Sequence, residues 1–234
     1  MGILRIVATP IGNLEDLTWR AERVLREANF ILCEDTRVTK KLLDRYQITT
    51  PTVSYHQHSG DLKVDKIRIL LREGKSLALV TDAGTPGISD PGGKLVSLVR
   101  KEFGDQVLIE SVPGVSALAT AVSLAGAGFD RFLFLGFLPH KKGRQTMLTE
   151  IMASKYPAVL YESKHRIIKL LEELATMSRE LKITVEITVA RELTKMHESF
   201  YQGSPADILE KLTADANNLK GEFVVLVRRL KDND

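Results

Sequence analysis

The chain carries the sequence LALVTDAGTPGISDPGG at residues 77–93, and this stretch decides the predicted fold. Its first four residues are apolar, as in a strand buried on both faces of a sheet. Thirteen residues rich in glycine and proline follow, and a helix is predicted from about Gly93 to Phe103. A simple turn needs only two to five residues, so this loop is too long for a connection alone. We expect the loop to face a ligand at the carboxyl end of its strand, although a tight surface turn is the alternative.

Short apolar runs alternate with helix-period segments on both sides of this loop. The first half has runs at Leu4–Val7, Phe30–Cys33 and Val107–Ile109, which predict further strands. Such alternation is typical of βα units on a mostly parallel sheet. Turn chemistry at residues 111–114 then interrupts the pattern. We therefore predict an α/β protein of two α/β domains, residues 1–113 and residues 114–234.

The first predicted helix follows Asp16, which is a suitable N-cap residue. Apolar residues recur at helical spacing on one face, at Leu17, Ala21, Val24, Leu25 and Ala28. Trp19 is expected to pack in the core or to staple the start of this helix. In the second domain, strands are predicted at residues 132–135, 158–161, 183–189 and 223–227, and helices at residues 144–154, 166–176 and 205–216.

Composition excludes several classes of protein. With 44% hydrophobic and 27% charged residues the chain is an ordinary globular protein, and its apolar runs are far shorter than a membrane span. The N-terminus lacks the features of a signal peptide, and the single cysteine, Cys33, fits a reducing compartment, so we expect a cytoplasmic protein. The net charge of +3 permits an anionic partner without requiring one.

Two nucleotide-binding motifs occur only in incomplete form, which disfavours ATP hydrolysis and NAD binding. Residues 87–92 resemble a phosphate-binding loop, but Gly93 stands where that loop needs lysine, and Arg131 stands where a dinucleotide motif beginning at Gly126 needs glycine. His56 and His58 lie near Asp61, but a zinc site usually has three or four organised ligands. We expect solvated histidines and no metal.

Three more clusters lie at predicted strand ends or just after them: residues 9–13, 111–117 and 190–195. Each alone resembles an ordinary turn, but together with the 81–93 loop they predict one shared crevice. Candidates for a general base there are Asp82, Asp90, Glu162, Glu192 and Lys195, and the sequence does not rank them. Arg37 and Arg191 are candidate phosphate anchors. The basic run 140–144, with Lys141, Lys142 and Arg144, is either a solvated loop or a phosphate contact.

The chain resembles the tetrapyrrole-methylase-like (class III) family of S-adenosylmethionine-dependent methyltransferases, and within it the branch that modifies small-subunit ribosomal RNA. The long form of the Asp82 loop is the feature that separates this branch from the corrin and sirohaem methylases. The resemblance runs along almost the whole chain through VATPIGNL (7–14), CEDTR (33–37), the loop 82–92, VPGVSA (112–117), GFLP (136–139), YES (161–163), ARELTK (190–195) and KGEF (220–223).

The resemblance implies two α/β domains with S-adenosylmethionine in the cleft between them, usually in a homodimer. It further implies 2′-O-methylation of a cytidine ribose in small-subunit (16S) ribosomal RNA. The partner would be either the free RNA or the small ribosomal subunit. The residues expected to contact the cofactor are Pro10, Asp82, Gly84, Thr85, Ile88, Ser116, Ala117, Tyr161, Glu162, Ala190 and Arg191.

Two other functions stay open at this point. A methylase of a tetrapyrrole or other small anionic metabolite would use the same fold and cofactor, whereas a noncatalytic ribosome-assembly factor would bind the cofactor without turnover. Members of the family often carry a small C-terminal helical extension. We therefore expect RNA binding by this chain to come from its two domains or from a partner.

Overall fold

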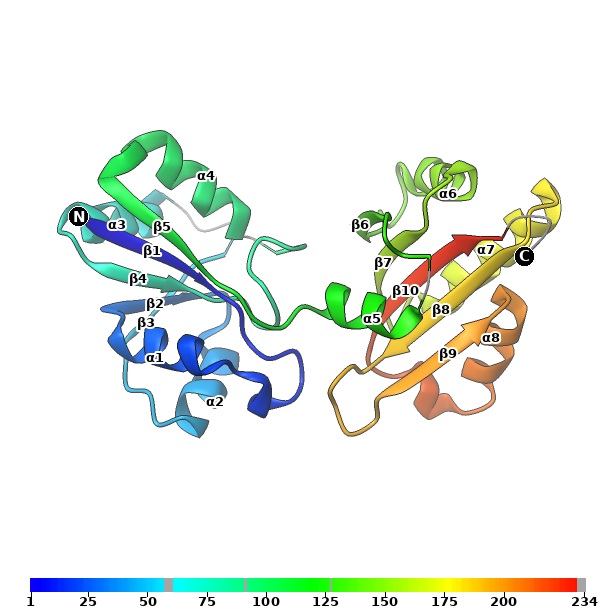
Figure 1. The fold of residues 1–234 in the computed structure, drawn as a ribbon, viewed down its shortest axis with the longest axis horizontal. Coiled ribbons are helices and arrows are strands. Elements are labelled where there is room, and N and C mark those ends of the chain that lie inside the picture. The colour runs from blue at the N-terminus through cyan, green and yellow to red at the C-terminus, as the bar shows by residue number, and fades with distance from the viewer. Residues whose placement is uncertain (57–60, 91, 127, 231–234) are drawn as a thin grey trace. The chain divides into compact units, whose positions relative to one another are not determined.

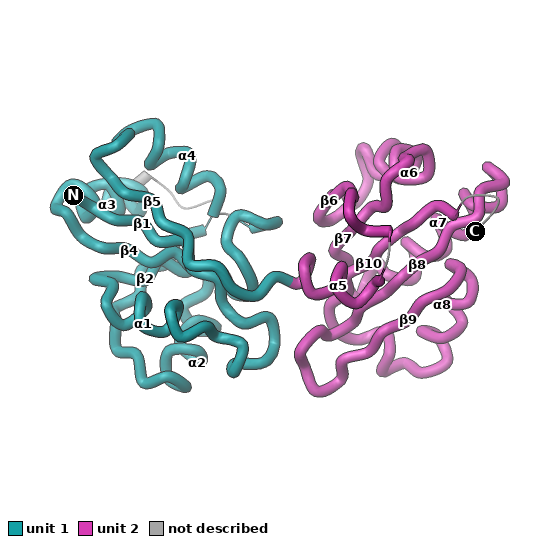
Figure 2. The backbone as a smooth tube through the Cα atoms, viewed as in Figure 1, with its two compact units in different colours: residues 1–116 teal, residues 117–234 magenta. Residues whose placement is uncertain are grey.

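The computed structural model describes residues 1–56, 61–90, 92–126 and 128–230. The chain divides into two compact units, unit 1 with residues Met1–Ser116 and unit 2 with residues Ala117–Asp234 (Figure 2). The sequence placed this division after Pro113. None of the described helices is long and apolar enough to cross a membrane.

Unit 1 contains a five-stranded sheet in the order β3-β2-β4-β1-β5 (Figure 1), in which every neighbouring pair is parallel. Parallel neighbours need crossover connections, and helices provide them here. The elements are β1 (Gly2–Val7), η1 (Leu14–Asp16), α1 (Trp19–Glu27), β2 (Phe30–Cys33), α2 (Thr36–Arg45), β3 (Thr52–Ser54), α3 (Asp61–Arg72), β4 (Ser76–Leu79), α4 (Gly92–Phe103), η2 (Gly104–Gln106) and β5 (Val107–Val112).

Side chains of this sheet alternate between two hydrophobic cores, one on each face. In β4, Ala78 belongs to the core formed with α1 and α2, whereas Leu77 and Leu79 belong to the core formed with α3 and α4. Both faces are therefore covered, as the uninterrupted apolar runs predicted.

Helix α1 begins two residues later than the sequence suggested. Asp16 ends the short helix η1, and Thr18 is the N-cap of α1, because its side chain accepts a hydrogen bond from the Ala21 amide at 3.1 Å. The predicted apolar face of α1 is buried as expected. Trp19 was expected to pack in the core or to staple the start of this helix, and it is instead 92% exposed.

Unit 2 contains a second five-stranded sheet in the order β6-β7-β10-β8-β9. Only β6 and β7 pair in parallel, and the other pairs are antiparallel. The mostly parallel sheet predicted for the whole chain is thus found in unit 1 alone, since β8 and β9 are joined without a crossover helix. The elements are α5 (Ala117–Ala125), β6 (Leu133–Phe137), α6 (Arg144–Ala153), β7 (Ala158–Ser163), α7 (Ile167–Leu181), β8 (Val185–Arg191), β9 (Ser199–Gly203), α8 (Pro205–Thr213), η3 (Ala216–Leu219) and β10 (Glu222–Arg229).

One hydrophobic core joins one face of this sheet to α6, α7 and α8. Helix α5 contacts β10. The predicted strand at residues 183–189 is found two residues later, so Ala190 and Arg191 belong to the end of β8 and are not in a turn. This shift places the polar segment 192–198 directly after a buried strand.

Candidate functional site

Three loops of unit 1 meet beyond the carboxyl ends of β1, β4 and β5. Thr9 and Gly84 exchange two backbone hydrogen bonds, of 2.9 and 3.0 Å, and the Thr9 hydroxyl donates to the Thr81 carbonyl at 3.1 Å. The Thr85 hydroxyl donates to the carbonyl of Val115 at 2.9 Å. Three of the four polar clusters singled out in the sequence therefore lie together in space, although they are far apart along the chain.

The loop after β4 keeps its shape through glycine and aspartate. Gly84 and Gly87 have φ angles of +84° and +92°, which residues with a Cβ adopt only at a cost, and Ser89 also lies in this region at +64°. The Asp90 carboxylate accepts hydrogen bonds from the amides of Gly87 and Gly92. Asp90 therefore holds the loop closed, which is a structural role beside the catalytic one considered from the sequence.

Carboxylates gather at the ends of β2 and β4. Burial raises the pKa of Glu34, and the negative charges of Asp82 and Asp90 raise it further, while His56 opposes them. Asp82 is exposed, and its carboxylate accepts a hydrogen bond from the Asp35 amide at 3.1 Å. Burial is the larger cause of this shift, and the additional effect of Asp82 and Asp90 indicates negative charge at this end of the sheet, which favours a cationic ligand.

No group of three or more possible metal ligands occurs in the described part of the chain. His58, considered above as a ligand, lies outside the described residues. Asp35 and Arg37 form an ion pair of 2.6 Å, and the hydrogen bonds from Arg37 lower the pKa of Asp35 to about 2. The Arg37 side chain is nevertheless 88% exposed, so it can reach a substrate.

In unit 2, Arg191 fixes the loop between β8 and β9 from inside. Arg191 is 6% exposed, and its guanidinium donates to the carbonyls of Lys220 at 2.7 Å, His197 at 2.8 Å and Asn217 at 2.7 Å. The His197 carbonyl belongs to the loop between β8 and β9, whereas those of Asn217 and Lys220 belong to η3 and its C-cap. Because the guanidinium is committed to them, Arg191 is a structural clamp in this unit.

The next residues place an ammonium group between two carboxylates. The Lys195 ammonium group donates to Glu192 at 2.8 Å and to Glu222 at 2.9 Å. Burial lowers the pKa of Lys195, but the two hydrogen bonds outweigh it and the pKa is raised. Burial likewise raises the pKa of Glu192, yet the bonds from Lys195 and from the Glu222 amide bring the net shift downward. Both groups are therefore charged at neutral pH.

Glu162, at the end of β7, is the most deeply buried carboxylate of the predicted site residues. It is 1% exposed, and its Oε1 atom is 2.8 Å from Arg166 and accepts a hydrogen bond from the Ser163 amide at 2.7 Å. Its Oε2 atom has no hydrogen bond and lies 3.9 Å from Arg144. Sequence reasoning missed Arg166, although its spacing of four residues from Glu162 was a signal of pairing.

Arg144 departs from the expectation of a phosphate contact. It is 4% exposed, and its guanidinium donates to Glu173 at 2.7 and 2.9 Å. A buried guanidinium that is already paired does not favour contact with RNA. Lys141 and Lys142, from the same basic run, are exposed.

The remaining predicted residues lie in these loops or in the elements next to them, with Ala117 at the start of α5 and Tyr161 within β7. Pro10 is buried, whereas Ile88, Ser116, Ala117 and Tyr161 are partly exposed. The Tyr161 ring packs edge to face against Phe134 and Phe137 at centroid distances of 5.1 and 5.7 Å. Gly114, which was not singled out by itself, lies against Ala8, since a Cβ there would be 3.0 Å from the Ala8 side chain.

Known proteins resemble this chain both in sequence and in fold. The model of the family described as Tetrapyrrole (Corrin/Porphyrin) Methylases matches residues 4–209. A protein of Xylella fastidiosa named ribosomal RNA small subunit methyltransferase I is 44% identical over 100% of this chain and 84% of its own length. Proteins of the same name from Hydrogenobaculum and Thermotoga maritima are 41% and 40% identical, over 97% and 89% of this chain and 95% and 91% of their own lengths.

Solved structures share the fold at low sequence identity. The crystal structure of a cobalt precorrin-4 methyltransferase has a TM-score of 0.70 at 18% identity and covers 97% of this chain and 94% of its own. The uroporphyrin-III-C-methyltransferase of Thermus thermophilus has a TM-score of 0.65 at 19% identity, with the same two coverages. The family match spans nearly the whole chain and agrees with these folds, so the chain belongs to the tetrapyrrole (corrin/porphyrin) methylase family, whose methyl donor is S-adenosylmethionine, as the sequence predicted.

Proposed function

We propose that this chain transfers the methyl group of S-adenosylmethionine to the 2′-oxygen of a cytidine ribose in small-subunit (16S) ribosomal RNA. The observation that carries this proposal is the identity of 40–44% to proteins named ribosomal RNA small subunit methyltransferase I. The solved corrin and porphyrin methylases share only 17–19% of the sequence and inform on the fold alone. An RNA substrate is therefore better supported than a small anionic metabolite.

The chemistry of unit 1 fits a cationic cofactor. S-adenosylmethionine carries a positive sulfonium, and the carboxylates of Glu34 and Asp82 create a negative potential at the carboxyl ends of β2 and β4. The glycines of the loop after β4 bring bare backbone to the same edge. The residues that we propose to contact the cofactor are Pro10, Asp82, Gly84, Thr85, Ile88 and Ser116 in unit 1, and Ala117, Tyr161, Glu162, Ala190 and Arg191 in unit 2.

The two buried charged residues of this set, Glu162 and Arg191, hold neighbouring groups in place. The Glu162 carboxylate is occupied by Arg166 and the Ser163 amide, and the Arg191 guanidinium is occupied by three carbonyls. We therefore assign a supporting role to both side chains, and contact with the cofactor would come from the strand ends that carry them.

Methyl transfer to an oxygen is an in-line displacement, and the acceptor hydroxyl must lose its proton. When bound, S-adenosylmethionine supplies the electrophilic methyl group. The raised pKa of Lys195 disfavours the free amine at neutral pH, whereas the lowered pKa of Glu192 keeps that carboxylate ionised. We therefore propose Glu192 as the group that accepts the proton and Lys195 as the cation that orients it, in preference to Asp82 and Asp90.

Exposed basic residues provide the phosphate contacts in this proposal. Arg37, Lys141 and Lys142 have solvent-accessible side chains. Arg144 is left out because its guanidinium is buried against Glu173. Action in the cytoplasm and a homodimeric state, both implied by the family, belong to the same proposal.

The test is transfer of labelled methyl from S-adenosylmethionine to small ribosomal subunits that lack the modification, followed by nuclease mapping. Label on a cytidine 2′-oxygen supports the proposal. Label on a porphyrinoid but none on RNA would replace it with a metabolite methylase. Binding of the cofactor with no transfer to either acceptor would instead indicate a noncatalytic assembly factor.

A further inference from the structure

Helix α1 presents the single tryptophan of the chain to solvent. Trp19 is 92% exposed, whereas Ala21 and Leu25 on the opposite face of the helix are fully buried. Tryptophan commonly buries 150–250 Å² when it packs. No ring contact involves Trp19 in the described ranges of the chain. A large, flat stacking surface is thus left open on this helix.

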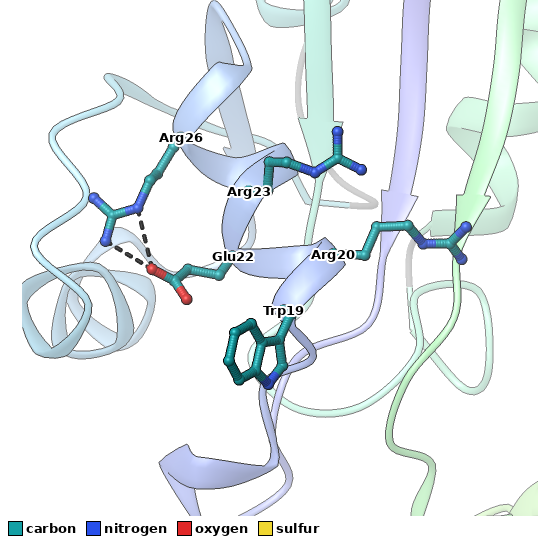
Figure 3. Close-up of a pocket in the computed structure, with 5 residues that line it drawn as sticks. All are labelled: Trp19, Arg20, Glu22, Arg23 and Arg26. Atoms are coloured by element: carbon teal, nitrogen blue, oxygen red, sulfur yellow. Dashed lines mark hydrogen bonds and ion pairs between the residues drawn. The ribbon is translucent and has the colours of Figure 1, made fainter.

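Three arginines of the same helix line a hollow together with Trp19. This open hollow has a volume of about 510 Å³. Figure 3 shows the residues that line it: Trp19, Arg20, Glu22, Arg23 and Arg26. Arg26 points away with Glu22, to which it is paired at 2.8 Å, and it also donates to the Gln47 carbonyl at 2.9 Å. Arg26 is therefore occupied within the fold.

Arg20 and Arg23 remain able to bind a ligand. Within the described residues, Arg20 has no hydrogen bond or ion pair, and Arg23 lies 3.9 Å from Glu27 in an exposed pair. An exposed pair at this distance contributes little and is exchanged easily for another anion. Two guanidinium groups are thus available on the helix that carries the exposed indole.

We infer that this surface of α1, formed by Trp19, Arg20 and Arg23, binds a single-stranded segment of the substrate RNA. The indole stacks on an unpaired base, and the two guanidinium groups bind flanking phosphates, which is the combination that proteins use for unpaired nucleotides. The inference rests on the proposed function for the identity of the RNA. It predicts a preference for single strands, because bases in a duplex have no free face for the indole.

Positive charge alone does not single out this surface. Helix α4, which packs on the opposite face of the unit 1 sheet, has three basic residues against one acidic residue, Glu102. Its aromatic residue, Phe103, is only 6% exposed. Helix α1 has the same number of basic residues and two acidic residues, so helix α4 offers a control with at least as much positive charge and no stacking surface.

The emission of Trp19 reports on this site alone, because the chain has no other tryptophan. The full chain is titrated with a 12-nucleotide single-stranded oligoribonucleotide of mixed sequence and with the corresponding duplex, and fluorescence anisotropy of labelled RNA gives the affinity of each variant. We expect the single strand to quench the emission. Trp19→Ala should weaken binding by about 5-fold to 150-fold, the range for loss of one base–aromatic stack, and Trp19→Phe should retain most of the affinity.

The charges are tested by the salt dependence of binding. The double variant Arg20→Ala/Arg23→Ala should reduce the slope of log Kd against log salt by about 1.4, since each phosphate contact to a single strand contributes about 0.7. The control Arg100→Ala/Lys101→Ala, on α4, should bind as the unchanged protein does. An equal loss in both double variants would overturn the inference in favour of nonspecific charge.

Two further outcomes would overturn it. The first is RNA binding without quenching, or with full affinity in Trp19→Ala. The second is emission that changes with protein concentration when no RNA is present, which would assign the surface to a protein contact. If the unchanged chain methylates small subunits and Trp19→Ala does so with the same KM, the inference fails and the proposed function stands. If the unchanged chain methylates no RNA, the proposed function fails, and the quenching result still stands by itself.

Discussion

Replacing Gly221 by alanine would displace Glu192 without altering any ionisable group. Gly221 has a φ angle of +100°, and a Cβ atom built there would lie 2.4 Å from both Cγ and Cδ of Glu192. Such a separation is below any real carbon contact, so the flexible Glu192 side chain must move. Its Oε1 atom would then leave the position in which it accepts hydrogen bonds from Lys195 and from the Glu222 amide.

The expected loss of stability has two parts. An L-residue in the left-handed region costs about 1–2 kcal/mol. One hydrogen bond to the charged Lys195 contributes about 1.5–3 kcal/mol and one backbone hydrogen bond about 0.5–1.5 kcal/mol. Together, Gly221→Ala should destabilise unit 2 by about 3–6 kcal/mol if both bonds are lost. If Glu192 accepts the proton of the ribose hydroxyl, its displacement should slow transfer by about 10²-fold to 10⁴-fold.

Gly126→Ala is the matched control. Gly126 lies in the same unit with a φ angle of +79°, and a Cβ there would meet no atom within 4 Å. It therefore imposes a similar backbone cost and leaves Glu192 in place. Urea unfolding followed by circular dichroism measures the stability of both variants, and single-turnover methyl transfer to small ribosomal subunits measures their rates.

The outcomes separate the steric argument from the catalytic one. Equal destabilisation of the two variants would refute the steric argument, since only Gly221→Ala should break the hydrogen bonds of Glu192. A Gly221→Ala protein that folds, binds S-adenosylmethionine and transfers methyl at the unchanged rate would refute the need for Glu192 in its observed position. A slow Gly221→Ala beside a normal Gly126→Ala is the expected result.

Three other predictions concern the buried pairs and the joined loops. Arg144→Ala should destabilise unit 2 by about 1.5–3 kcal/mol in urea unfolding, because it removes the charged hydrogen bonds from the buried guanidinium to Glu173, whereas Lys142→Ala should change stability by less than about 0.5 kcal/mol; similar values for both would contradict the role of this pair. Thr85→Val removes the hydroxyl bond between two loops of unit 1 and should weaken S-adenosylmethionine binding in calorimetry by about 2-fold to 10-fold, and unchanged affinity would count against a cofactor role for these loops. The pKa of Glu192 is lowered in the folded protein, so the stability that Glu192 contributes is present above pH 4.5 and is lost as the pH falls through the folded pKa. The pKa of Lys195 is raised, so the stability that Lys195 contributes is present below pH 10.5 and is lost as the pH rises through the folded pKa. The difference in urea midpoint between the unchanged protein and Glu192→Gln should therefore disappear at low pH, and a constant difference would refute this coupling.

Much of unit 1 was predictable because its central strands are buried on both faces. The strands β2 and β4 are continuous apolar runs, β1 is interrupted only by Arg5, and the edge strand β5 begins with three apolar residues. The carboxyl ends of these strands must share one edge of a parallel sheet. The strand Thr52–Ser54 escaped notice since three residues carry no periodic signal. Unit 2 was harder to predict, because the antiparallel insertion of β10 between β7 and β8 depends on contacts between distant segments.

The sequence predicted a packed Trp19 and an exposed Arg144, whereas Trp19 is exposed and Arg144 is buried. Average tendencies bury tryptophan and expose arginine, but the helical positions of Ala21, Val24 and Leu25 already place Trp19 on the opposite face of α1. That signal was present in the sequence. The burial of Arg144 was not predictable, since its partner Glu173 is 29 residues away on another helix.

The loop after β8 holds a residue conformation that local sequence preferences disfavour. Glu192 and Thr194 have φ angles of +51° and +66°, and each such non-glycine residue costs about 1–3 kcal/mol. The conformation persists because Arg191 donates to His197 of this loop and to two carbonyls of the segment before β10, so that relaxing the loop would leave a donor of the buried guanidinium unsatisfied. Local propensity alone would select a glycine or asparagine at these positions. Strain that is held by a buried clamp fixes the positions of the Glu192 carboxylate and the Lys195 ammonium group in the absence of substrate. If Glu192 accepts the proton of the acceptor hydroxyl, as we propose, this pre-organisation is what that proton transfer requires.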